Sequence, residues 1–146
     1  MGSLTETNFT KSECGKYLVD SCILIYMLDN KEVYKHKQAM QWFASCKERI
    51  FLSAQNLREF ASNCLLLRAP TEDIINLIEL FSSKFLVLQD DFLDTKNAVE
   101  MSKHNPRLFW DASIVSVMKR NGIECIYTEN TKDFELLGVK AINPLK

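Results

Sequence analysis

A chain of 146 residues with 47% hydrophobic residues is large enough for one folded domain with its own core, and this composition excludes an intrinsically disordered protein. The net charge of -1 excludes a global basic field, so a polyanionic substrate would need a local basic patch or bridging metal ions. No apolar run approaches the roughly 20 residues of a membrane-spanning helix, and we expect no membrane association.

The five cysteines are widely scattered, form no Cys-x-x-Cys pair and are accompanied by only two histidines. This pattern argues against a structural zinc site. Cysteines among apolar neighbours are typical of small buried hydrophobic residues. We therefore expect a protein of a reducing compartment, the cytoplasm.

Residues 1–15 are polar and aperiodic, which predicts a flexible N-terminal tail before a folded domain over residues 16–146. In that domain, short apolar strands alternate with helical segments. The expected elements are a strand at 16–20, helices at 22–28 and 31–49, a strand at 50–52, helices from 53 to about 68 and from 71 past 81, a strand at 85–88, helices from about 90 to 101 and at 109–120, and strands at 124–127 and 140–142. The alternation predicts an α/β fold in which helices flank a central, mostly parallel sheet.

Local signals mark the helix boundaries. Ser53 and Thr71 are suitable N-caps, and the Ala69-Pro70 pair ends the helix between them. Asn121-Gly122 is a C-terminal stop for the helix at 109–120. The buried stripe expected for the helix after Thr71 consists of Ile74, Ile75, Ile78 and Phe81.

Acidic residues stand at the edges of several apolar segments. Asp20 ends the first strand, Asp111 opens the helix at 109–120, and the polar segment 129–133 follows a late strand. In open α/β sheets, ligands bind beyond the carboxyl ends of the strands, so Asp20 and segment 129–133 are expected at one rim. Carboxylates gathered there need a positive partner, which predicts a divalent cation and a metal-dependent hydrolase.

Each acid also has a purely structural interpretation. Asp111 shares the apolar stripe of its helix, but acids in a first turn are also favoured by the helix dipole, by about 0.3–1 kcal/mol. Asp20 is suited to a turn or cap after a strand. Glu59 falls away from the centre of its helix's apolar stripe, so the pattern alone predicts a solvated acid.

Other conspicuous residues are interpreted as structural. Trp42 and Trp110 are expected in or near the core rather than as stacking platforms. Asp90, Asp91 and Asp94 are interpreted as capping and surface acids.

Four segments, taken in order, resemble the motifs of PIN-domain ribonucleases, particularly VapC-type toxins, and the resemblance runs from residue 16 to the end of the chain. They are Tyr17–Tyr26, Leu52–Phe60, Phe109–Val115 and Ile126–Phe134, followed by Ile142-Asn143-Pro144. The resemblance implies a PIN-like three-layer α/β fold. Cys22 departs from the family's usual asparagine, which removes one polar neighbour of the site.

The resemblance also implies a site. Its catalytic residues would be Asp20, Glu59, Asp111 and Asp133, of which Asp20, Asp111 and Asp133 would bind Mg²⁺ or Mn²⁺. Glu59 would hold or deprotonate the attacking water. Residues that would contact substrate or support the acids are Asn130, Ser21 and Arg107, and basic residues available for phosphate are Lys31, Lys35, Arg68, Lys103, Arg107 and Lys132. Asn130 supplies no negative charge, which would weaken a second metal.

The implied function is endonucleolytic cleavage of RNA by the toxin of a toxin–antitoxin pair, with a small antitoxin as partner and a homodimer as assembly. The alternative is a catalytically inactive PIN-like module that binds RNA or protein, in which Cys22 and Asn130 mark a decayed site. A receiver domain fits poorly, because that fold has an acidic pair after its first strand, whereas in this chain the pair Asp90-Asp91 follows the third strand. A haloacid-dehalogenase-like phosphatase needs a second aspartate two residues after Asp20, where Cys22 stands.

Overall fold

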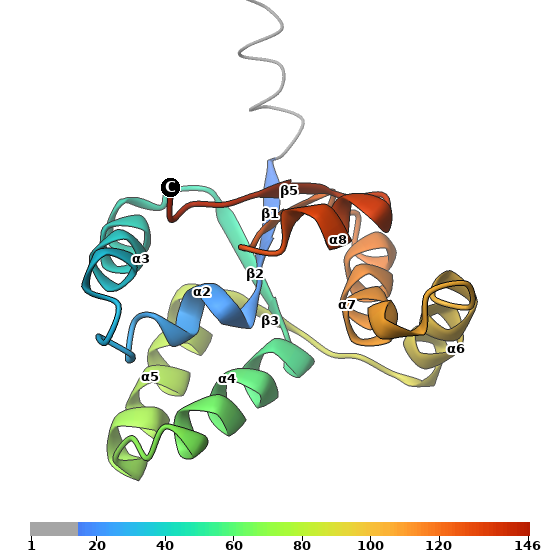
Figure 1. Cartoon of the computed structure of the whole chain (residues 1–146). Coiled ribbons are helices and arrows are strands. Elements are labelled where there is room, and N and C mark those ends of the chain that lie inside the picture. Colours follow the sequence, from blue (N-terminus) through green and yellow to red (C-terminus); the bar gives the residue numbers. More distant parts are fainter. Residues whose placement is uncertain (1–14) are drawn as a thin grey trace, which may run out of the picture.

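The computed structural model describes residues 15–146, in which five strands form one sheet covered by helices on both faces (Figure 1). The strands are β1 (Lys16–Val19), β2 (Arg49–Ser53), β3 (Leu86–Leu88), β4 (Cys125–Tyr127) and β5 (Lys140–Ile142). Their order is β3-β2-β1-β4-β5, and every pairing is parallel. The predicted central parallel sheet is therefore confirmed. The tail predicted for residues 1–15 lies, apart from Gly15, outside the described residues.

The helices of the described chain connect successive strands. They are α2 (Ser21–Ile25), α3 (Val33–Ser45), α4 (Ala54–Leu66), α5 (Thr71–Lys84), α6 (Phe92–Met101), the 3-10 helix η1 (Pro106–Leu108), α7 (Phe109–Arg120) and α8 (Thr131–Leu136). Two of these, η1 and α8, were not predicted, because helices of three and six residues are too short to show a hydrophobic period. None of the helices between residues 15 and 146 combines the length and apolar character needed to cross a bilayer.

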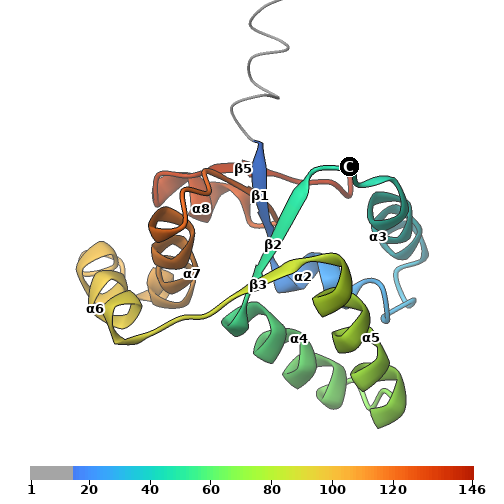
Figure 2. The same cartoon turned by 180° about the vertical axis from the view of Figure 1, so that it is seen from behind.

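Successive side chains of β1 point to opposite faces of the sheet and so divide the core in two. Tyr17 and Val19 pack with α2, α3, α4 and α5, whereas Leu18 packs with α6, α7 and α8. Figures 1 and 2 show these helix groups on either side of the strands. The three-layer architecture expected from the sequence is confirmed, and both faces of the sheet are buried as a parallel sheet requires.

The buried stripe of α5 is narrower than predicted. Ile74 and Phe81 are buried and Ile78 is partly buried, but Ile75 is 50% exposed. Because α5 packs against α4 and the edge strand β3, only a thin face of this helix is covered. The prediction that Ile75 is buried was wrong.

Asp94, interpreted as a surface acid, is 1% exposed and ties α6 to α7. Arg120 Nη2 donates to its Oδ2 at 2.6 Å, and Ser116 Oγ donates to its Oδ1 at 2.7 Å. Burial alone would raise the pKa of Asp94, but hydrogen bonds from Arg120, Ser116 and the Asp91 amide hold it below the ordinary 3.8. Asp94 does complete the capping box of α6, as a capping acid would. Its interpretation as a surface acid was wrong, because the partners that make its burial tolerable lie more than twenty residues away.

Candidate active site

Asp20 stands where β1 ends and α2 begins, and four neighbours fix its carboxylate. The Ser21 amide donates to Oδ1 at 2.9 Å, and Thr128 Oγ1 donates to Oδ2 at 2.8 Å. Asn56 Nδ2 donates to Oδ1 at 3.4 Å, and the Cys22 thiol donates to Oδ2 at 3.6 Å. Asp20 is only 8% exposed, and this burial raises its pKa. The hydrogen bond from Thr128 lowers the pKa, whereas the negative charge of Glu59 raises it. Asp20 is thus a rigidly held carboxylate whose charge is costly without a cation.

Glu59 reaches the same place from α4. Its Oε1 accepts a hydrogen bond from Ser21 Oγ at 3.2 Å, and its Oε2 accepts one from Gln55 Nε2 at 3.1 Å. The start of α4 is set by a capping box between Ser53 and Asn56, and the Asn56 side chain also donates a hydrogen bond to Asp20. One helix therefore carries both an acid of the site and a hydrogen-bond donor to another acid.

Asp111 lies in the first turn of α7, and Asn130 Nδ2 donates to its Oδ2 at 3.0 Å. The pKa of Asp111 is raised to about 7, chiefly by burial and in addition by the nearby charges of Asp20, Asp133 and Glu59. Repulsion among carboxylates is one cause of such a shift, and it shows that these acids share one electrostatic environment.

A cleft of about 520 Å³ collects these groups at the carboxyl edge of the sheet. Its lining residues are Asp20, Ser21, Cys22, Glu59, Asn63, Asp111, Glu129 and Asn130. Glu129 is paired with Lys35 at 2.8 Å, whereas the three predicted acids here have no salt bridge within the described chain. The structure thus brings together three of the four acids proposed from the sequence.

The fourth acid, Asp133, lies in the first turn of α8 and does not line this cleft. Arg107 Nη1 and Nη2 donate to its two carboxylate oxygens at 2.8 and 2.9 Å. This hydrogen-bonded pair lowers the pKa of Asp133, which is therefore an ionised carboxylate already paired with a cation. Its charge still reaches Asp111, so it stands next to the cleft rather than in it.

Three polar residues that hold the acids were not singled out from the sequence. Thr128, Asn56 and Gln55 are buried, although residues of these types are usually exposed. The signal for Asn56 was its place three residues after the N-cap Ser53, which is a capping-box spacing. Thr128 and Gln55 carry no such signal, because their roles depend on segments distant in sequence.

The prediction for the two tryptophans was half right. Trp42 is buried in the core formed with α3, but Trp110 is 64% exposed at the start of α7. Its exposure follows from its position, because Asp111, the next residue, faces the cleft edge while the buried side of α7 begins at Ala112.

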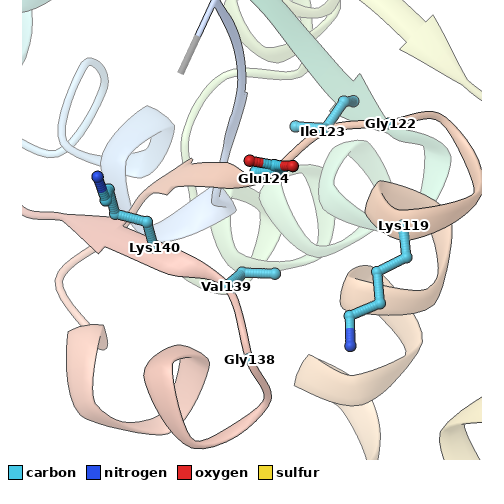
Figure 3. A pocket seen from close by; sticks show the side chains of 7 residues that line it. All are labelled: Lys119, Gly122, Ile123, Glu124, Gly138, Val139 and Lys140. Carbon is cyan, nitrogen blue, oxygen red and sulfur yellow. The ribbon is translucent and has the colours of Figure 1, made fainter. Parts of the chain in front are cut away.

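A second hollow of about 370 Å³ lies at the opposite, amino edge of β4 and β5 (Figure 3). Lys119, Glu124 and Lys140 are its charged residues, and Gly122 and Gly138 adopt positive φ values of 69° and 89° in its turns. It contains one acid and two lysines, so it offers no cluster of carboxylates. The acidic cleft remains the place where chemistry-bearing groups converge.

The donor set of the acidic cleft is chemically suited to Mg²⁺ or Mn²⁺. Its ligating groups are carboxylate oxygens, the hard donors that these ions prefer. Within residues 15–146, no three His, Cys, Asp or Glu side chains stand close enough to enclose an ion. Because Mg²⁺ keeps several waters and is commonly held by one or two carboxylates, this loose arrangement fits such an ion and not an all-protein cage.

The PIN domain family profile matches residues 17–140 of the chain. In a search of curated protein sequences, none matches this chain. Among solved structures, VapC20 of Mycobacterium tuberculosis, a sarcin–ricin-loop-cleaving toxin, is 21% identical with a TM-score of 0.72, over 88% of this chain and 99% of that one. DNA-bound VapBC from Salmonella typhimurium is 20% identical with a TM-score of 0.62, over 88% and 98%. VapBC-1 from nontypeable Haemophilus influenzae is 18% identical with a TM-score of 0.62, over 90% and 99%. At such identities the likeness shows the shared fold.

Proposed function

The chain belongs to the PIN domain family, and we propose that it is a divalent-metal-dependent endoribonuclease whose active site is the acidic cleft. The observation that carries this proposal is the convergence of Asp20, Glu59 and Asp111 from three separate segments on one cleft. The cleft lies at the carboxyl edge of the sheet, where ligands of α/β folds bind. Buried, mutually repelling carboxylates are stabilised when a cation binds between them, and phosphodiesters are substrates that such cations bridge.

We assign Asp20 and Asp111 as the residues that hold Mg²⁺ or Mn²⁺, with Asp133 contributing through a water. When bound, such an ion lowers the pKa of a water and neutralises charge that develops on the phosphate. Thr128 and Asn56 fix the direction of the Asp20 carboxylate, as outer hydrogen bonds do for metal ligands.

Glu59 is proposed to orient the attacking water and to accept its proton. Ser21 and Gln55 each donate a hydrogen bond to one of its oxygens, so the carboxylate is held in place and keeps lone pairs for the water. A base held in this way acts without first reorganising, which is what positioned general-base catalysis requires.

Arg107 is proposed to bind a substrate phosphate. Its guanidinium forms a two-pronged contact with Asp133, and the same fork geometry matches a phosphate group. Because the Arg107 side chain is 61% exposed, a phosphate in the cleft can compete for it and free Asp133 for the ion.

We further propose that the protein is a cytoplasmic toxin, a homodimer neutralised by a small antitoxin. The support is the fold it shares with structures of VapBC complexes, over nearly the full length of those toxin chains. The second candidate, a catalytically inactive RNA- or protein-binding module, is favoured by one feature, the amide of Asn130 and the thiol of Cys22 in the cleft.

Cleavage of a labelled single-stranded RNA pool separates these two functions. We expect cuts in Mg²⁺ or Mn²⁺, none with chelator, and a loss of about 100-fold or more in Glu59→Gln, since a positioned base contributes roughly 10²–10⁴-fold. Glu79→Gln, an equally conservative change at an exposed position on α5, should cleave like wild type. Intact RNA under all metal conditions, with a folded protein, would favour the inactive module.

A further inference from the structure

Trp110 presents a large aromatic surface to solvent immediately beside an acid of the site. It is 64% exposed and directly precedes Asp111 in α7. An indole left in water is unfavourable, because its flat apolar faces are better covered by another surface. The position therefore suits a ligand that has a flat face of its own.

The space beside this indole adjoins the acidic cleft. A hollow of about 270 Å³ is lined by Gln55, Arg58, Glu59, Ser62, Asn63 and Trp110. Glu59 and Asn63 line the acidic cleft as well, so a ligand can extend from one hollow into the other. The lining combines one aromatic ring, one cation, the Glu59 carboxylate, two amides and one hydroxyl. The ring, the cation and the neutral polar groups can contact a nucleotide through its base, its phosphate and its polar edges.

The backbone of Trp110 is held in position relative to the acids, and the neighbouring Phe109 ring contacts the indole. Gln55 Nε2 donates to the carbonyl oxygen of Trp110 at 3.1 Å, and the same atom donates to Glu59 Oε2 at 3.1 Å. Phe109 meets the indole nearly at a right angle, with ring centroids 5.1 Å apart and an interplanar angle of 82°. A perpendicular contact of this kind leaves at least one indole face uncovered by Phe109.

We propose that Trp110 stacks on an unpaired nucleobase of the RNA whose phosphodiester lies at the acidic cleft. The proposal rests on the nuclease function and specifies its substrate as single-stranded RNA, because the bases of a duplex are already stacked on each other. Arg58, which is 66% exposed and paired with Asp90 at the surface, is placed to contact a backbone phosphate of the same nucleotide. Stacking is tolerant of base identity, so Trp110 positions the strand without selecting a sequence.

Intrinsic fluorescence tests the stacking without any cleavage. The chain has two tryptophans, one buried and one exposed, so short single-stranded RNA added in chelator should quench emission of wild type and of Trp42→Phe. Trp110→Phe, which keeps only the buried Trp42, should show no quenching.

The anisotropy of labelled RNA measures the affinity. Trp110→Ala should bind single-stranded RNA about 5- to 100-fold more weakly than wild type, and Trp110→Phe should keep part of the wild-type affinity. RNA binding with unchanged emission, or equal affinity in Trp110→Ala, would overturn the proposal.

A kinetic comparison separates this inference from the nuclease function. With metal, Trp110→Ala should raise KM for single-stranded RNA by a similar factor and leave kcat within about twofold, since stacking is present in ground and transition states alike. Metal-dependent cleavage with an unchanged KM overturns the stacking role and leaves the nuclease standing. Quenching of Trp110 by RNA in chelator, with no cleavage of the same RNA when Mg²⁺ or Mn²⁺ is added, supports stacking and refutes the nuclease. No binding of single-stranded RNA at all overturns the stacking role, and a protein partner then becomes the candidate occupant of this surface.

Discussion

Replacement of Asp20 by asparagine should lower metal-dependent RNA cleavage by at least about 100-fold, because it removes a charge that offsets several kcal/mol in the transition state. Asp20 is the most firmly positioned acid of the cleft, with hydrogen bonds from Ser21 and Thr128 at 2.9 and 2.8 Å. Asparagine keeps the size of the side chain and one acceptor oxygen. Initial rates on a labelled single-stranded RNA, with circular dichroism and a melting curve as fold controls, measure the effect.

A matched aspartate-to-asparagine change away from the cleft provides the control. Asp73 is exposed in the first turn of α5, so Asp73→Asn should cleave at the wild-type rate. An Asp20→Asn protein that is folded and retains more than about a tenth of the wild-type rate would contradict the assignment of Asp20 as a metal ligand.

Replacement of Arg120 by methionine should lower the free energy of unfolding by about 2–4 kcal/mol, the largest stability effect we expect from a single polar contact here. It leaves the Asp94 carboxylate, 1% exposed, without its positive partner. The effect should be somewhat smaller than for a wholly buried pair, because the Arg120 side chain is 38% exposed. Urea unfolding at neutral pH measures it.

The pH dependence identifies the cause. Since the folded pKa of Asp94 lies below its ordinary 3.8, the pair stabilises the fold fully above that value and loses its contribution as the pH falls through the folded pKa. The difference between wild type and Arg120→Met should therefore shrink in acid. Arg58→Met, which breaks the surface pair with Asp90, should cost less than about 1 kcal/mol. Equal losses in the two variants at neutral pH would refute the account of Asp94.

The acids that follow strands could be located from sequence alone, because the parallel sheet brings strand ends to one edge. Asp20 is the clearest case, since its strand was visible as an apolar run. Asp111 was found through its helical stripe. Periodicity did not favour Glu59, because this residue lies at the border of the buried face of α4, where the apolar stripe of the helix ends and the cleft begins. Only the family resemblance selected it.

Residues whose environment is made by distant segments could not be predicted. The burial of Asp94 depends on Arg120, and the alignment of Asp20 depends on Thr128, more than one hundred residues away. Trp110 was expected in or near the core, whereas its place in the first turn of α7 leaves it exposed. Asp133 was predicted to lie among the ligands, but it pairs with Arg107 of η1, since η1 and α8 both pack on α7.

The most direct test of the account is the melting temperature of wild type and Asp111→Asn, each in chelator and in saturating Mn²⁺. In chelator the variant should melt higher than wild type, because it removes one of several crowded carboxylates. Mn²⁺ should raise the wild-type Tm by several degrees through binding to the folded state, and should raise that of the variant far less. A wild-type Tm that is unchanged by Mn²⁺, or equal shifts in both proteins, would contradict the claim that the acidic cleft is a metal-binding active site.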